Sequence, residues 1–267
     1  MYNAMTAEVS PLSSPAAALD SPRIKLLAIG DVGVGKSCVI KRYCEGRFVT
    51  KYIPTIGIDF GVKKVEVNKA AVLQRRSGSS AGASGGGGSN SSSSSSIPAA
   101  VRVNFWDGSG DDDYREIRNE FYDAAQGILL FYDVRDARSF ENLQTWWDEL
   151  GTYCEGLAAR EKNAAPDGKR QSVTPMTVTG NTAAGKAVGN NEGKAPIVVL
   201  CANKADDTVV GGTGSAARET RVVTEEQGRA WAKAHGCAGY YETSASTEKN
   251  VKEAVEDLVT QVVATFM

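Results

Sequence analysis

The stretch from Gly30 to Ser37 reads GDVGVGKS, a glycine-rich octet that ends in a lysine and a serine. An apolar run at 24–29, typical of a buried strand, precedes it, and a helical pattern at 38–45 follows it. In the spacing G-x-x-x-x-G-K-S, glycines let backbone N–H groups turn inward around a polyphosphate, and the following helix adds the positive end of its dipole. The octet therefore predicts a strand–loop–helix unit that binds a nucleoside triphosphate.

The last two residues of this loop have distinct expected roles. Lys36 would reach the β- and γ-phosphates, and the hydroxyl of Ser37 would be a ligand of Mg²⁺. The residues expected around the phosphates are Gly30, Asp31, Val32, Gly33, Val34, Gly35, Lys36, Ser37 and Cys38.

The composition indicates a globular protein and argues against several classes of partner. The 267 residues include 30 Lys and Arg against 32 Asp and Glu, so the overall charge suggests neither nucleic acid nor an anionic membrane. The five cysteines are scattered and lack C-x-x-C spacing, which favours reduced thiols in a cytoplasmic protein. No signal peptide is evident, Tyr2 excludes N-myristoylation, and no cysteine near Met267 could be prenylated, so no lipid anchor is expected.

Three segments are rich in small and polar residues and lack apolar periodicity; the clearest, at 77–96, is almost only serine and glycine. Such segments cannot build a core. The remainder, roughly 170 residues, suits one domain, which we expect at 23–267. The expected disordered parts are a tail at 1–22 and insertions at about 72–100, 157–194 and 207–220.

Outside these segments, apolar runs of strand length alternate with helical patterns. Residues 127–134 and 196–202 are nearly continuous apolar runs, as in parallel strands that are buried on both faces. Helical patterns cover 139–154, 224–234 and 249–264. This alternation predicts a doubly wound α/β sheet whose ligand loops follow the carboxyl ends of its strands.

Residues 57–67 and 101–106 break the alternation. Their apolar residues recur at every second position, as in a half-exposed hairpin, which would carry the serine- and glycine-rich segment at its tip. Lengthening a short tip to about thirty residues costs only about 2 kcal/mol of loop-closure entropy, so the hairpin can still form.

The segment Asn203-Lys204-Ala205-Asp206 directly follows a predicted strand. The carboxylate of Asp206 can accept hydrogen bonds from N1–H and the exocyclic amine of guanine, which adenine does not offer in the same place. Asn203 would tie this loop to the phosphate loop or contact the base, and the aliphatic stem of Lys204 can cover the ring. After a phosphate loop and a strand, this segment favours guanine as the base.

Further polar residues follow other predicted strands. Asp107 would hold Mg²⁺ through water, and the N–H of Gly110 in the same D-x-x-G segment would sense the γ-phosphate. Thr55 could close on this metal and phosphate as part of a mobile loop. Ser244 and Ala245 end another strand, where the N–H of Ala245 would bind the guanine carbonyl. Taken singly, each of these residues equally fits an ordinary turn.

In their order along the chain, these motifs resemble those of the Ras superfamily of small GTPases. Residues 52–60 (YIPTIGIDF) look like the Rab branch, and residues 37–48 (SCVIKRYCEGRF) and 118–122 (RNEFY) look like the RJL group of Rab-like proteins. The resemblance covers about 23–262, apart from the three insertions. It implies the P-loop GTPase fold with a mostly parallel six-stranded sheet, and GTP or GDP with Mg²⁺ as ligands.

The resemblance also implies partners and a location. Phe48 would pack on the guanine, and Tyr52 would join the nucleotide-binding residues. Segments near Thr55 and from Asp107 to Tyr122 would be switches that bind effector proteins, with exchange and activating factors as further partners. The expected location is cytoplasmic, with ciliary, flagellar-base or nuclear contexts among RJL relatives. Some of these carry a J domain, which we do not expect here because the only histidine, His235, is not in an H-P-D triplet.

Two residues depart from the pattern of efficient hydrolases. Small GTPases usually place Gln after D-x-x-G to orient the attacking water, whereas this chain has Asp111, which is shorter and is repelled by phosphates. Val32 stands where hydrolytic Ras proteins keep Gly and can crowd that water, although Rab relatives vary here. The RJL resemblance implies that the missing Gln is a group property. We therefore expect intact GTP binding with slow hydrolysis, with Asp111 and Gly110 at the catalytic position.

Two alternatives remain open. One is a conventional cycling GTPase whose partner supplies the missing water-positioning group. The other is a scaffold that binds no nucleotide, which the presence of Lys36, Ser37, Asn203 and Asp206 disfavours. A P-loop nucleoside kinase is disfavoured by the N-K-x-D segment and by the lack of an arginine-rich lid.

Overall fold

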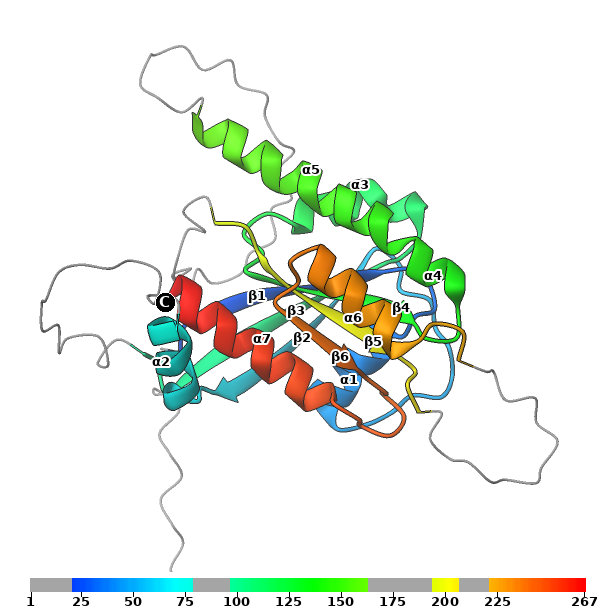
Figure 1. Cartoon of the computed structure of the whole chain (residues 1–267), viewed down its shortest axis with the longest axis horizontal. Helices are drawn as coiled ribbons and strands as arrows, with labels where there is room; N and C mark the ends of the chain where they lie inside the picture. Colours follow the sequence, from blue (N-terminus) through cyan, green and yellow to red (C-terminus); the bar gives the residue numbers. More distant parts are fainter. Residues whose placement is uncertain (1–20, 79–96, 163–193, 207–220) are drawn as a thin grey trace, which may run out of the picture.

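One mixed β-sheet organises the computed structural model, which describes residues 21–78, 97–162, 194–206 and 221–267 (Figure 1). Within these residues the sheet has six strands in the order β2-β3-β1-β4-β5-β6. They are β1 (Arg23–Gly30), β2 (Ile58–Glu66), β3 (Ala100–Gly108), β4 (Gly127–Asp133), β5 (Ile197–Asn203) and β6 (Gly239–Glu242). Only the pairing of β2 with β3 is antiparallel, so the expected mostly parallel six-stranded sheet is confirmed.

Helices cover both faces of the sheet. Those in the described residues are α1 (Lys36–Glu45), α2 (Lys69–Gly78), α3 (Arg115–Phe121), α4 (Ala137–Glu141), α5 (Leu143–Lys162), α6 (Glu225–Ala234) and α7 (Val251–Phe266), with a short 3₁₀ helix η2 (Asp112–Tyr114). Buried side chains of α1, α2 and α7 pack on one face, and those of α5 and α6 on the other. No helix among the described residues combines the length and the apolarity needed to cross a membrane.

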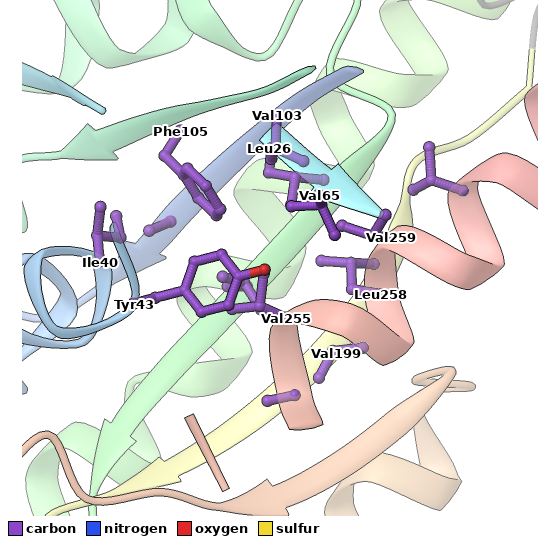
Figure 2. Close-up of a cluster of buried hydrophobic side chains, with 14 of the residues drawn as sticks. Leu26, Ile40, Tyr43, Val65, Val103, Phe105, Val199, Val255, Leu258 and Val259 are labelled. Carbon is purple, nitrogen blue, oxygen red and sulfur yellow. The ribbon is translucent and has the colours of Figure 1, made fainter. Parts of the chain in front are cut away.

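The core consists of two apolar layers that share the central strands. On β1, Leu26 points into the layer under α1 and α7, whereas its neighbour Leu27 points into the layer under α5. Such alternation is what a strand buried on both faces requires. In the first layer the ring of Tyr43 packs edge-on against Phe105, with their centroids 5.6 Å apart, and Leu258 of α7 belongs to the same buried cluster (Figure 2).

The connection between β2 and β3 differs from the expected insertion at about 72–100. It begins with α2, in which Val72 is fully buried against the layer that contains α7. Arg75 forms an ion pair with Asp257 of α7, and Arg76 donates to the carbonyl oxygen of Ala264 at 3.3 Å. The apolar residues before the serine run therefore build a helix that packs on α7. Residues 79–96 lie outside the described residues.

Two other boundaries differ as well. Helix α5 continues to Lys162, beyond the expected start of the second insertion at 157. The helical pattern expected at 139–154 forms two helices, α4 and α5, that meet at Asn142. Helix α6 begins as expected, because Thr224 and Gln227 form a reciprocal capping box. The remainders of the expected tail and insertions, at 1–20, 163–193 and 207–220, lie outside the described residues.

Candidate nucleotide site

A cavity of about 490 Å³ lies at the carboxyl ends of β1 and β5, where the topology of a parallel sheet places ligand loops. The predicted residues that line it are Val32, Gly33, Gly35, Lys36, Ser37, Cys38, Phe48, Tyr52, Thr55, Gly110, Asp111, Asn203, Lys204, Asp206, Ser244 and Ala245. The fold thus brings together motifs that are far apart in the sequence. Four other predicted residues are not part of the lining but form hydrogen bonds with residues that are: Gly30, Asp31, Val34 and Asp107.

The loop after β1 is fixed to the loop after β5 by an asparagine. Nδ2 of Asn203 donates to the carbonyl oxygen of Val34 at 2.7 Å, and the hydroxyl of Thr243 donates to Oδ1 of Asn203 at 3.1 Å. Gly35 has a φ of 96°, and a Cβ there would lie 2.4 Å from Nδ2 of Asn203. Only glycine fits this contact, so Asn203 takes the first of its two expected roles and ties the loops together.

Lys36 lies buried inside the curl of the phosphate loop. Its Nζ donates to the carbonyl oxygens of Gly30 at 2.7 Å and Asp31 at 2.8 Å. Burial lowers the pKa of Lys36 to about 8, while the carboxylates of Asp107 and Asp31 oppose this shift. An anionic ligand in the cavity would stabilise the charged ammonium, which suits the binding of a polyphosphate.

Asp107, Ser37 and Thr55 form a cluster of oxygen atoms next to Lys36. The hydroxyls of Ser37 and Thr55 share a hydrogen bond of 2.9 Å, and Thr55 donates to Oδ2 of Asp107 at 3.3 Å. Among the described residues, the buried Oδ1 of Asp107 has no hydrogen-bond partner. Burial also raises the pKa of Asp107, against the hydrogen bond from Ser37 and the charge of Lys36. A buried carboxylate oxygen without a partner beside two hydroxyls fits a hard cation such as Mg²⁺.

The expected base-reading residues lie at the other end of the cavity. Oδ1 of Asp206 is 3.1 Å from Nη2 of Arg135, and its Oδ2 accepts a hydrogen bond of 3.1 Å from Ser246. Nζ of Lys204 is 2.6 Å from Oδ2 of Asp133, the last residue of β4. Each charged residue of this loop is thus held by an oppositely charged or polar neighbour.

Helix α1 is joined to the Ser244–Ala245 loop by hydrogen bonds from Arg42. Nε of Arg42 donates to the carbonyl oxygen of Ala245 at 2.8 Å, and its Nη2 donates to that of Ser246 at 3.1 Å. The same guanidinium is 5.8 Å from the centroid of the Phe48 ring, which is 38% exposed. Because the carbonyl oxygen of Ala245 accepts a hydrogen bond from Arg42 of α1, the orientation of the peptide group between Ala245 and Ser246 is fixed.

The side chains of two predicted site residues, Asp31 and Asp111, form hydrogen bonds with other groups of the protein. The carboxylate of Asp31 accepts hydrogen bonds of 2.7 Å from Asn142 and from the indole of Trp146, so only its backbone faces Lys36. The carboxylate of Asp111 accepts from the N–H of Asp113 at 3.1 Å and caps η2. Its side chain is therefore directed along its own segment.

Gly110 lies tightly against the phosphate loop. A Cβ at this position would come within 2.4 Å of the backbone of Asp31 and Val32. Only glycine allows this close approach, which brings the D-x-x-G segment to the edge of the cavity. The contact of Gly110 with the phosphate loop is a feature of the fold, and the contact of its N–H with the γ-phosphate stays a prediction.

Sequence reasoning missed a buried arginine beside this segment. Arg118 of α3 is 1% exposed and donates to the carbonyl oxygens of Ser109 at 2.9 Å and Asp111 at 3.2 Å. It also binds both carboxylate oxygens of Glu149 on α5, at 2.9 and 3.1 Å, and its guanidinium lies 4.4 Å from the ring centroid of Trp146. No local pattern in the sequence indicates these distant partners.

Arg135 was also missed, although a signal for it exists. It follows the apolar run at 127–134 by one residue, and the loop after such a strand is where an α/β sheet places ligand contacts. The structure places it in the lining of the cavity, beside Asp206.

The comparisons with known proteins identify the family of this chain. The Ras family model matches residues 25–75, 89–163 and 180–264. The proteins called DnaJ homolog subfamily C member 27 from Bos taurus and Homo sapiens are each 32% identical to this chain over 243 residues, which are 91% of this chain and 62% of theirs. The protein of that name from Danio rerio is 32% identical over 242 residues, with the same coverage.

The chain spans about 62% of the length of these curated relatives. The family match covers most of the described residues, including the phosphate loop, the D-x-x-G segment and the N-K-x-D loop. The resemblance to small GTPases that the motifs indicate is confirmed, and the chain belongs to the Ras family.

Proposed function

We propose that this protein is a Rab-like GTP-binding switch that depends on Mg²⁺, hydrolyses GTP slowly and binds effector proteins in its GTP state. The observation that carries the proposal is the shared cavity. In and beside it lie the buried ammonium of Lys36, the oxygen cluster of Ser37, Thr55 and Asp107, and the carboxylate of Asp206. These groups would match the phosphates, the Mg²⁺ and the guanine of GTP-Mg²⁺.

In this proposal, each part of the ligand has its own protein contacts. Lys36 and the N–H groups of the phosphate loop bind the phosphates, and Ser37, Thr55 and Asp107 hold Mg²⁺, which when bound offsets the charge of the phosphates. Asp206 accepts the two guanine donors, and Phe48, Tyr52, Lys204 and the Ser244–Ala245 loop surround the base and ribose.

Slow hydrolysis follows from the position of Asp111. Its carboxylate caps η2, and because it is shorter than the side chain of Gln and is repelled by the phosphates, it is poorly suited to orient the attacking water. Val32, which is 52% exposed in the lining of the cavity, adds a branched side chain beside the same region. The site therefore favours holding GTP over cleaving it.

The proposed effector surface lies on the segments that contain Thr55 and Asp107, two residues of the oxygen cluster. Ile53, Ile56 and Ile117 are exposed large apolar residues in the two switch segments, and Phe60 of β2 extends this surface. Phe60 packs on Trp106 with a centroid distance of 4.6 Å. In the GTP state Thr55 would contact Mg²⁺ and the γ-phosphate, so loss of the γ-phosphate would release the segment that carries Thr55. Exchange and activating factors are proposed partners, and the proposed location is cytoplasmic.

Nucleotide binding by the purified full chain tests the proposal. We expect GDP and GTP to bind in the presence of Mg²⁺, ATP to compete at least about a thousandfold more weakly, and EDTA to accelerate nucleotide release. Lys36→Ala should abolish this binding, and Lys69→Ala, at an exposed position of α2 outside the lining of the cavity, should leave it unchanged. Absence of guanine nucleotide binding, or equal binding of ATP, would contradict the proposal and favour the nucleotide-free scaffold.

A further inference from the structure

We propose that Arg135 determines the base specificity of this site by holding Asp206 in the orientation in which its carboxylate reads both guanine donors. The inference rests on the proposed function, because it concerns the base-binding end of the same cavity. Arg135 is a positioning residue in this role: it acts through Asp206.

The backbone after β4 fixes where the Arg135 side chain starts. Its N–H donates to Oδ1 of Asp133 at 2.9 Å, while Oδ2 of Asp133 is 2.6 Å from Nζ of Lys204. Asp133 pairs with Asn203 across β4 and β5. The end of β4 therefore contacts the N-K-x-D loop through two ion pairs, Asp133 with Lys204 and Arg135 with Asp206.

Among the described residues, the contacts of Asp206 leave one acceptor position open on each of its two carboxylate oxygens. Arg135 contacts Oδ1, and Ser246 donates to Oδ2, both at 3.1 Å. Each carboxylate oxygen can accept about two hydrogen bonds, so one position remains on each oxygen. Guanine has two donors side by side, N1–H and the exocyclic amine, and these match the two remaining positions.

Fixing the carboxylate matters because Asp206 lies near the surface. Its side chain is 26% exposed, so without partners it could rotate and lose freedom only when a base binds. Arg135 and Ser246 order it beforehand. A base with a single donor, such as hypoxanthine, then leaves one acceptor unpaired, and a fixed carboxylate cannot turn to compensate.

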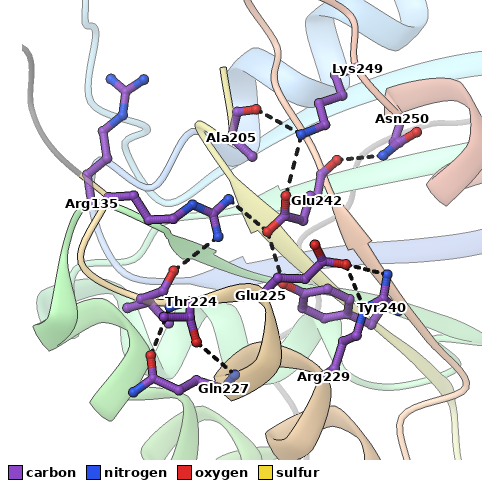
Figure 3. A network of polar contacts seen from close by, with 12 residues as sticks. Arg135, Ala205, Thr224, Glu225, Gln227, Arg229, Tyr240, Glu242, Lys249 and Asn250 are labelled. Atoms are coloured by element: carbon purple, nitrogen blue, oxygen red, sulfur yellow. Dashed lines mark hydrogen bonds and ion pairs between the residues drawn. The ribbon is translucent and has the colours of Figure 1, made fainter. Parts of the chain in front are cut away.

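The backbone of the N-K-x-D loop has supports that do not involve Arg135. Nζ of Lys249 donates to the carbonyl oxygen of Ala205 at 3.1 Å and lies 3.4 Å from Glu242 (Figure 3). The N–H of Ala205 donates to the carbonyl oxygen of Thr243 at 3.0 Å. Replacing Arg135 should therefore change the orientation of the Asp206 side chain without displacing the loop.

The test compares GDP with IDP, which lacks the exocyclic amine. Dissociation constants of both nucleotides are measured with the full chain, its Arg135→Gln variant and, as a matched control, Arg138→Gln, an exposed arginine three residues away. We expect Arg135→Gln to weaken GDP binding by about tenfold and IDP binding by less than about threefold, so that the preference for GDP falls. Arg135→Lys should restore part of it, and Arg138→Gln should keep the wild-type ratio.

Each contrary outcome has a distinct meaning. An unchanged ratio, or an equal loss for both nucleotides, would overturn the inference and leave Arg135 a structural role. Tighter GDP binding by Arg135→Gln would overturn it too, because Arg135 would then compete with the base for Asp206. If the wild-type chain binds neither nucleotide, the proposed function itself fails.

Discussion

At the scale of single residues, the lowered pKa of Lys36 couples nucleotide binding to pH. Burial lowers the pKa of Lys36 to about 8, well below its usual 10.5. Bound phosphates favour the ammonium, so above pH 8 binding must take up a proton, and affinity must fall as pH rises. We expect GDP affinity to be nearly constant from pH 6.5 to 7.5 and to fall by up to about tenfold per pH unit above 8.

Equilibrium titrations of GDP at several pH values measure this effect. Guanine loses its N1 proton in a similar range, so the Lys36→Arg variant, whose guanidinium stays charged, serves as the reference. Any decrease of GDP affinity with pH that remains in this variant results from the loss of the guanine N1 proton. If wild type and variant show the same pH profile, Lys36 is not the coupled group.

Asp111 is the second residue whose chemistry can be tested alone. Asp111→Gln removes a negative charge and supplies a neutral amide that can orient water, so single-turnover hydrolysis of GTP should accelerate by about tenfold to a hundredfold. Asp112→Gln, the next residue of the acidic run, is the control for charge alone. Equal rates in wild type and Asp111→Gln would contradict slow hydrolysis by this cause. Strong acceleration of the wild type by cell extract would favour a partner that supplies the missing group.

At the scale of elements, Arg118 joins the D-x-x-G segment to α5. Its buried guanidinium satisfies two backbone carbonyl oxygens and the Glu149 carboxylate. Arg118→Met removes one partner of a buried ion pair, so we expect the free energy of unfolding in urea to fall by about 3 to 5 kcal/mol.

Arg115 provides the control for this prediction. It contacts the same Glu149 at 3.3 Å, but its side chain is 55% exposed, so Arg115→Gln should cost less than about 1 kcal/mol. Similar losses in the two variants would show that the backbone contacts of Arg118 contribute little. If Arg118→Met lowers the free energy of unfolding but leaves the rate of nucleotide exchange unchanged, the contact of α5 with the D-x-x-G segment does not influence nucleotide exchange.

The same scale shows why some elements can be predicted from the sequence and others cannot. The strands at 127–134 and 196–202 and the capped helix at 224–234 have local patterns, and the structure forms them close to the expected bounds. Helix α2 has only a few apolar residues before a serine run, and its burial depends on α7, which lies far along the chain. The composition of this segment therefore does not predict that α2 packs on α7.

At the scale of the whole molecule, the motifs converge because parallel strands end at one edge of the sheet. This topological rule let Lys36, Asp107 and Asp206 be assigned to one site before any geometry was known. Such a rule does not predict the side-chain partners of Asp206 and of the D-x-x-G segment. Glu149 meets Arg118 across 31 residues of sequence, and Arg135, after β4, meets Asp206, after the neighbouring β5. Side-chain pairs of this kind depend on packing.

Helix α2 contacts the end of α7 (Figure 1). This contact lies at the end of the strands opposite the cavity, because α2 follows Glu66, which pairs with Ala100 at the start of β3. We therefore expect a tether or a fused protein joined near α2 to leave the geometry of the cavity unchanged. Labels for microscopy or immobilisation belong there.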